Sequence, residues 1–238
     1  MGLDAKSMVE RLLFHATPEG YPKDFPVVSK YQIPLLPKVS LSDIPEALIA
    51  FDDRRRAASP SQTGLHFYRD DRKFAGPLIE PVKWVDRFAS FKCTLTPDVT
   101  IAKGMPEYLR ISNTVHSRDA GAVWSHHGLK VIPSLRWVSQ EDYDFVFAGI
   151  EMGSVVAVSN YGSYLEPEAK IIFEQGLDAL ISTLEPKGII LFGKLYPRLT
   201  DIVQDRTQLF PRPPITSTFR TTPAKPHESS ETDFTLFD

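Results

Sequence analysis

Short apolar runs alternate with longer amphipathic stretches through the middle of the chain. The runs at residues 49–51, 155–158 and 189–192 have the length and apolar content typical of buried strands. The clearest amphipathic stretch covers residues 166–184, where apolar positions recur at helical spacing and Pro167 fits the first turn. We therefore expect an α/β body with a mostly parallel sheet of about six strands and alternating helices, either barrel-like or doubly wound.

Two places interrupt this alternation. Only about eleven residues separate Asp52 from Leu65, which is short for a parallel crossover that contains a helix. Pro133 falls inside a predicted strand, where its missing N–H donor is costly unless the strand bulges. We expect an irregular first connection and a bulge at Pro133.

Proline content divides the chain into three parts. Residues 1–42 are expected to combine a short helix with a proline-rich wrapping segment. Residues 43–205 form the predicted parallel α/β domain. Residues 206–238, which alternate proline with serine, threonine and charges, are expected to be a flexible tail without its own core.

The tail ends in three large hydrophobic residues, Phe234, Leu236 and Phe237. Hydrophobic groups after a polar tether are typical of short peptide ligands. This end resembles the peptide with which bacterial replication proteins bind the sliding clamp, although Asp233 stands where the usual glutamine would be. A host sliding clamp is therefore one predicted partner.

Composition and charge set broad limits. The net charge of −3 disfavours nucleic-acid binding through overall charge, and leaves open a local basic patch such as Arg54-Arg55-Arg56, which is otherwise a solvated loop. Cys93 is the only cysteine, so no intramolecular disulfide forms, and we expect a small buried hydrophobe there. We see no signal peptide and no apolar run near the roughly 18 residues of a spanning helix, and expect a cytoplasmic protein without membrane contact.

Polar residues gather where the predicted strands end, and parallel α/β folds form their sites at the carboxyl ends of strands. Asp70 and Asp98 follow two such strands. Carboxylates that converge at one edge can divide acid and base roles or bind a divalent cation, whereas a lone aspartate after a strand more often serves a turn. Asn113, within residues 105–127 that look helical, marks either a site or a helix break.

Two further pairs follow strands and suggest substrate binding. Arg136 can clamp an anionic group, and Trp137 either stacks on a flat ligand or covers the core. Asn160 and Tyr161 precede a glycine turn and a helix start, a place that can offer backbone donors to an anion.

Two other features of the predicted helix at residues 105–127 leave alternatives open. Arg110 and Arg118 either form surface ion pairs or clamp a phosphate together. The adjacent pair His126-His127 lacks the spacing of zinc ligands, and we predict no metal site.

Five stretches form a set with a wider resemblance: TPD at residues 96–98, ISNT at 111–114, GLKVIPSLRW at 128–137, YDFVFAGI at 143–150 and VVAVSNYG at 155–162. With these stretches the segment from Pro97 to Gly193 resembles an uncharacterised family of bacteria, phages and plasmids that is catalogued as a domain of unknown function. The resemblance implies a mobile-element setting and a mostly parallel α/β body. It implies no activity, substrate or cofactor.

Two hypotheses about function follow. The first is a hydrolase or transferase that acts on a phosphate- or sugar-bearing, nucleotide-like substrate at the carboxyl edge of the sheet. Its catalytic residues would be Asp98, Asp70 and Asn113, and its substrate-binding residues Arg136, Trp137, Asn160 and Tyr161. The alternative is a non-catalytic phage or plasmid protein that binds a host replication protein or nucleic acid through its C-terminal peptide. Neither the cofactor nor the oligomeric state follows from the sequence.

Overall fold

The computed structural model describes residues 18, 20–161, 166–203 and 207–211. Its strands are β1 (Val27–Val28), β2 (Ile33–Pro34), β3 (Ala47–Ala50), β4 (Thr63–His66), β5 (Cys93–Leu95), β6 (Val131–Ile132), β7 (Ser134–Leu135), β8 (Val155–Ser159), β9 (Gly188–Gly193) and β10 (Thr207–Pro211). Its α-helices are α2 (Ala75–Ile79), α3 (Val85–Phe88), α4 (Glu107–His126), α5 (Tyr143–Val146), α6 (Pro167–Leu184) and α7 (Pro197–Val203). The 3₁₀ helices are η1 (Leu41–Asp43), η2 (Phe51–Arg56), η3 (Pro60–Gln62), η4 (Asp71–Lys73), η5 (Pro81–Trp84) and η6 (Gln140–Asp142).

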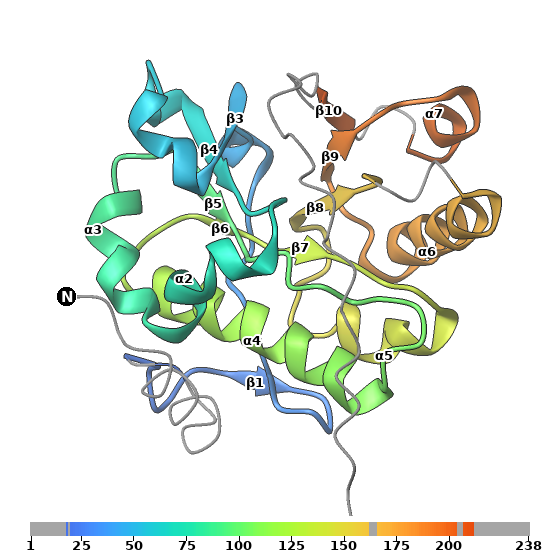
Figure 1. The fold of residues 1–238 in the computed structure, drawn as a ribbon, viewed down its shortest axis with the longest axis horizontal. Coiled ribbons are helices and arrows are strands. Elements are labelled where there is room, and N and C mark those ends of the chain that lie inside the picture. The colour runs from blue at the N-terminus through green and yellow to red at the C-terminus, as the bar shows by residue number, and fades with distance from the viewer. Residues whose placement is uncertain (1–17, 19, 162–165, 204–206, 212–238) are drawn as a thin grey trace, which may run out of the picture.

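The main strands form two parallel sheets whose spatial order follows the chain, β3-β4-β5-β6 and β7-β8-β9-β10. Right-handed crossovers in such a sequential order place every helix on the same face of the strands. Figure 1 shows the helices around the outside of the strands, from α2 and α3 through α4 to α5, α6 and α7. The α/β class with parallel strands is therefore confirmed. Of the two arrangements considered, the barrel-like one fits, because a doubly wound sheet needs a reversal of strand order.

Pro133 divides what would be one strand into β6 and β7. β6 pairs with β5 on one side, and β7 pairs with β8 on the other. The Pro133 carbonyl accepts a hydrogen bond from the Ala157 N–H at 2.8 Å, whereas Pro133 itself has no N–H to offer. The chain thus passes from one sheet to the other at the proline, and the expected interruption lies where the sequence predicted it.

The connection between β3 and β4 is also irregular, as the short spacing predicted. Two 3₁₀ helices, η2 and η3, replace the α-helix that usually joins parallel strands. The sheet extends beyond residue 205, however, where we predicted a tail. Thr207–Pro211 pair in parallel with β9 as β10, and Phe210 is buried in the core, so this apolar stretch supports a strand among the prolines.

The core lies on both faces of the strands. The inner face holds one buried cluster, which comprises Val39, Cys93, Leu95, Ile132, Val155, Ala157, Ile190, Phe192 and Phe210. Two outer clusters lie under α2, α3 and α4 and under α5, α6 and α7. The prediction that Cys93 is buried is confirmed, and the helical spacing of apolar residues in α6 corresponds to a buried face that includes Leu177 and Leu180. The N-terminal helix and the C-terminal peptide that we predicted lie outside the described residues.

Aromatic rings close the inner face at its carboxyl end. The ring of Phe192 on β9 lies 4.6 Å from that of His66 and 4.7 Å from that of Tyr68, both at the end of β4. These contacts join the two sheets, so aromatic side chains fill the space between the sheets at this end. None of the helices in the described part of the chain is both long and apolar enough to cross a membrane.

Candidate functional site

The switch of partner at Pro133 opens the sheet between β5 and β7. Beyond the proline, the backbone of Ser134 has no strand partner on the β5 side, and side chains take over. The Ser134 N–H donates to Thr96 Oγ1 at 2.9 Å, and the Ser134 carbonyl accepts from Arg118 Nη1 at 3.0 Å. A polar opening lined by side chains therefore lies at the carboxyl end of the strands.

Asp98 and Arg136 face each other across this opening. Arg136 Nε donates to Asp98 Oδ1 at 3.0 Å, and Arg136 Nη2 forms a second bond to Oδ2. The Asp98 side chain is 5% exposed and that of Arg136 is 35% exposed. The nearby charge of Asp98 raises the pKa of the Arg136 guanidinium above its ordinary value. The arginine thus combines a fixed orientation with access to solvent.

Arg118 lies beneath this pair and reaches in from α4. Its Nη2 donates to the Val146 carbonyl at 3.0 Å, while Nη1 contacts Ser134 and, at 3.4 Å, Thr96 Oγ1. Its Nε has no hydrogen-bond partner, and no carboxylate among the described residues forms an ion pair with it. Burial lowers the pKa of Arg118 to about 10, which leaves it charged at neutral pH. The opening therefore carries a buried positive charge without a counter-charge.

The first half of α4 supplies the other wall. Ser117 Oγ donates to the Pro97 carbonyl at 2.6 Å, and Asn113 Nδ2 donates to the Thr100 carbonyl at 2.7 Å. Thr100 is held from the other side by Asp71, which accepts from its N–H and its hydroxyl, both at 3.0 Å. The segment after β5 is thus fixed over the opening by α4 and η4.

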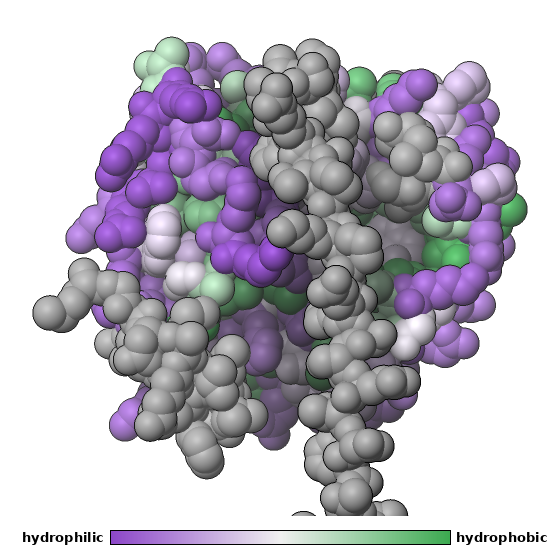
Figure 2. Space-filling model, in the orientation of Figure 1, coloured by the Kyte–Doolittle hydropathy of each residue, from purple (hydrophilic) through white to green (hydrophobic). Residues whose placement is uncertain are grey.

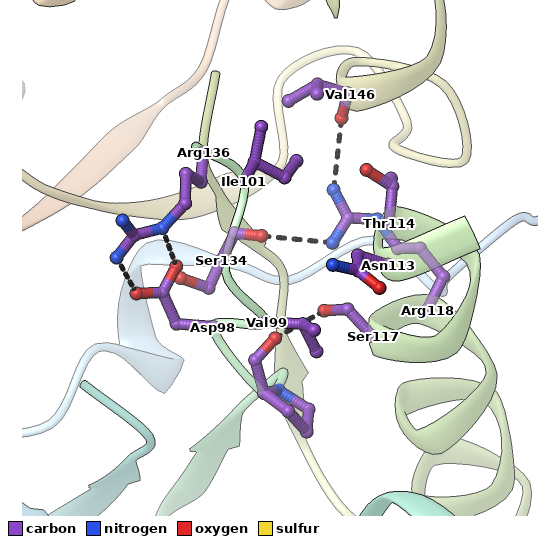
Figure 3. Close-up of a pocket in the computed structure, with 11 residues that line it drawn as sticks. Asp98, Val99, Ile101, Asn113, Thr114, Ser117, Arg118, Ser134, Arg136 and Val146 are labelled. Atoms are coloured by element: carbon purple, nitrogen blue, oxygen red, sulfur yellow. Dashed lines mark hydrogen bonds and ion pairs between the residues drawn. The ribbon is translucent and has the colours of Figure 1, made fainter. Parts of the chain in front are cut away.

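These groups surround one cavity, drawn in Figure 3. It is lined by Pro97, Asp98, Val99, Ile101, Asn113, Thr114, Ser117, Arg118, Ser134, Arg136 and Val146. Its volume of about 20 Å³ admits a single water molecule, so a larger ligand would have to bind at the mouth, where Arg136 is exposed. Tyr68 lies behind it, where its hydroxyl accepts from Ser134 Oγ at 3.2 Å and burial raises its pKa.

Among the predicted catalytic and substrate-binding residues, Asp98, Asn113 and Arg136 line this cavity, whereas Asp70, Trp137, Asn160 and Tyr161 do not. Asp70 lies on the surface at the start of η4, where Arg72 donates two hydrogen bonds to its carboxylate at 2.8 and 2.7 Å. The neighbouring Asp71, which we did not select, is the carboxylate that contacts the segment after β5. Tyr161 is 43% exposed and lies outside the lining.

Trp137 lies in the core and does not line the cavity. Its ring is 7% exposed, stacks on Phe173 at 5.5 Å and donates from Nε1 to the Ile172 carbonyl at 3.1 Å. A Cβ atom on Gly176 would lie 2.0 Å from Trp137 Nε1, so the glycine makes room for the indole. Trp137 therefore covers the core, the alternative that the sequence left open at that position.

Asn160 also has a structural role in place of the predicted binding role. It is fully buried, and its amide donates to the Lys194 carbonyl at 2.6 Å and accepts from the Lys194 N–H at 3.0 Å. Both polar ends of the side chain thus hold the turn after β9. They are not available to a ligand.

The two arginines of α4 do not act together. Arg110 lies 2.8 Å from the fully buried Asp142 and forms neither a surface ion pair nor part of the cavity. Arg118 is the functional candidate that sequence reasoning ranked too low, because we expected an exposed ion pair. One feature of the sequence could have indicated that Arg118 is buried. Residues 114, 117, 118 and 121 form a small and polar face of α4, and this face contacts the sheet.

No set of three or more metal-ligating side chains is placed to hold an ion in the described part of the chain. Asp98, the carboxylate we considered as a cation ligand, has both oxygens bound by Arg136. The arrangement suits an anion better than a cation, since two guanidinium groups and one carboxylate meet at the opening.

Comparisons with known proteins give a family without a described activity. The model of the domain of unknown function DUF4417 matches residues 25–208. The chain is similar to the Gene 1 protein of Mycobacterium phage L5, at 33% identity over 70% of this chain and 73% of the phage protein. It is also similar to the Gene 1 protein of Mycobacterium phage D29, at 31% identity over 72% of this chain and 63% of that protein, less than two thirds of its length. No solved structure matches.

Proposed function

Because the chain belongs to the phage-associated DUF4417 family, whose description assigns no reaction, we propose a function from the geometry of its cavity. We propose that the opening between β5 and β7 binds a phosphate-bearing substrate, and that the protein is a hydrolase or transferase. The observation that carries this proposal is the buried Arg118, which has no counter-charge and lies beside the solvent-accessible Arg136. The position at the carboxyl end of parallel strands supports it.

A phosphate group is the favoured ligand for two reasons. Arginine guanidinium groups bind phosphate oxygens in bidentate fashion, and a buried charge without a partner is costly unless a ligand supplies one. A sugar ring or a base would need a flat surface to stack on, and Trp137, which we considered for that purpose, is buried. The substrate class therefore narrows from phosphate- or sugar-bearing to phosphate-bearing.

The Asp98–Arg136 pair suggests how binding would prepare catalysis. A phosphate at the mouth of the cavity would compete with Asp98 for the Arg136 guanidinium. The released carboxylate would then be the general base that accepts a proton from the attacking water or hydroxyl. Asn113, which lines the same cavity, would position the substrate rather than exchange a proton, since an amide does not titrate.

The test is ligand-induced stabilisation followed by thermal unfolding. The probes are inorganic phosphate and adenosine monophosphate, and either one at 100 times its dissociation constant should add about 2.7 kcal/mol to the native protein. Arg136→Gln should abolish this effect. The matched control is Arg72→Gln, which removes a bidentate arginine–aspartate pair outside the cavity and should leave the effect intact.

Hydrolysis is measured in parallel with p-nitrophenyl phosphate, with and without added Mg²⁺. We expect turnover in the natural protein and none in Arg136→Gln. Both Arg136→Gln and Asp98→Asn break the Asp98–Arg136 pair, and a broken buried pair typically costs about 3–5 kcal/mol, so the folded state of each variant is checked by circular dichroism before binding is measured. The proposal would be refuted if neither phosphate probe bound to the natural protein. It would also be refuted if Arg136→Gln and Arg72→Gln lost the ligand-induced stabilisation to the same extent.

A further inference from the structure

A second group of arginines, none of which lines the cavity, lies on η2 and α3. Arg54 and Arg87 both lie over the indole ring of Trp84, with their guanidinium carbons 5.1 and 4.6 Å from its centroid. Arg55 is exposed beside them. We call Arg54, Arg55, Arg87 and Trp84 the arginine–tryptophan surface. It includes two of the three residues of the basic run that the sequence offered as a solvated loop or a phosphate contact.

The positive charges of this surface lack counter-charges within the described residues. Arg54, Arg55 and Arg87 form no ion pair within the described residues. The neighbouring carboxylates Asp52 and Asp53 form ion pairs with other cations. Those cations are Arg56, Arg69 and Lys73. The exposed Asp86 lies next to Arg87 on α3, and the three arginines outnumber it.

The guanidinium groups of this surface lie close enough together to repel one another. Burial lowers the pKa of Arg54, and the positive charges of Arg55 and Arg87 lower it further, while Asp52 raises it. Arg54 is nevertheless held in place, because its Nη1 donates to the Phe51 carbonyl at 3.1 Å and its head lies on Trp84. Trp84 itself is fixed by Phe51 and Phe88, with ring centroids 5.9 and 5.5 Å away.

We propose that the arginine–tryptophan surface binds the sugar–phosphate backbone of a nucleic acid. Phosphates along a backbone supply several negative charges in a row, which matches a group of arginines of which Arg55 and Arg87 are exposed. Arginines already ordered on an aromatic ring lose less conformational freedom on binding than free side chains do. Figure 2 shows hydrophilic side chains over this end of the molecule, near β3 and β4, with no broad apolar patch that would suit a protein partner.

The overall charge of −3 shapes the expected behaviour. The whole molecule does not attract a polyanion, so binding must depend on this local surface and must fall steeply with salt. Three phosphate contacts predict a slope of log K against log salt near −2.7 on duplex DNA, since each contact contributes about −0.9. The recognition would read the backbone and not the base sequence.

The experiment measures binding of the full chain to fluorescein-labelled 20-nucleotide DNA by anisotropy, single-stranded and as a duplex, between about 50 and 200 mM salt. Arg55→Ala/Arg87→Ala removes two of the three charges and keeps Arg54, which has a structural hydrogen bond. We expect at least about a tenfold loss of affinity at the lowest salt, and a duplex slope reduced by about 2. The matched control is Lys103→Ala/Lys187→Ala, which removes two exposed charges from loops outside this surface and should bind as the natural protein does.

Several outcomes would overturn the proposal. One is no binding of either DNA by the natural protein, and another is equal affinity in the natural protein and the arginine double variant. Equal loss in the lysine control would mean that net charge alone is responsible. If the arginine double variant does not fold, the single variant Arg55→Ala, which touches no described partner, must still lower the salt slope by about 1.

Discussion

Asp119 is a buried carboxylate on α4 whose titration should control the stability of the protein around neutral pH. It is 4% exposed, and within the described residues no hydrogen-bond donor and no cation contacts it. Burial raises the pKa of Asp119 to about 7, from an ordinary value of 3.8. Burial and, to a smaller extent, the charge of Asp119 raise the pKa of the Tyr21 hydroxyl to about 12.

The sign of the effect follows from proton binding. Between pH 3.8 and about 7 the folded protein holds a proton on Asp119 that the unfolded chain has lost. The free energy of unfolding therefore falls as pH rises through this window, and it levels off above it. A tenfold difference in proton affinity corresponds to about 1.4 kcal/mol, so the two pKa values set an upper limit of about 4 kcal/mol on this loss. Local relaxation and water entry reduce it, and we expect roughly 2–4 kcal/mol.

The assay is urea unfolding, followed by tryptophan fluorescence, at several pH values from 4 to 8. Asp119→Asn replaces the carboxyl group by a neutral group of similar shape, so its stability should not fall across the window. The variant should be more stable than the natural protein at pH 8 and no more stable at pH 4. Asp178→Asn, at an exposed position of α6, makes the same change in net charge and should follow the natural curve. Parallel curves for Asp119→Asn and the natural protein would refute the reasoning.

Two further predictions concern the packing of α6. Leu177 is fully buried, so Leu177→Ala should lower the free energy of unfolding by roughly 2–5 kcal/mol in urea titrations, and a change below about 0.5 kcal/mol would mean that the helix faces the other way. Gly176→Ala should displace the Trp137 indole, because the new methyl group has no room; we expect a loss of about 1–3 kcal/mol and a changed near-ultraviolet circular dichroism signal, whereas Ala179→Gly, at a half-buried position, should leave that signal unchanged.

The placement of Asp98 and Arg136 at one edge of the sheet could be anticipated from the sequence, whereas the ion pair between them was not predicted. Both residues follow strands, and the carboxyl ends of parallel strands meet at one edge. The same rule gave Asp70 too much weight, because a residue beyond the end of a strand is placed by the loop and not by the sheet. One position further along, Asp71 holds Thr100, while Asp70 holds only the nearby Arg72. The side of the sheet to which each residue of a strand points can be predicted from the sequence. The path of the loop that follows the strand cannot be predicted in this way.

Trp137 and Asn160 show a second limit of sequence reasoning. Each follows a strand, as functional residues do, yet each is buried by contacts with distant residues. Gly176 on α6 leaves a space that the Trp137 ring fills, and the backbone of Lys194 binds both ends of the Asn160 amide. A pattern of polar and apolar positions gives the side of a strand on which a residue lies. It does not show whether a partner far along the chain covers that residue.

At Pro133 the sequence predicted the break in the strand, but it did not predict what the break does to the neighbouring residues. The sequence indicated a break, because a proline inside a central strand loses a ladder hydrogen bond. The consequence is that β5 and β7 separate, and the Ser134 backbone needs new partners. Thr96 and Arg118 fulfil that need, which places a guanidinium group within the opening. The cavity therefore lies where the sheet is interrupted, and the residue that interrupts it also accounts for the buried charge on which the proposed function rests.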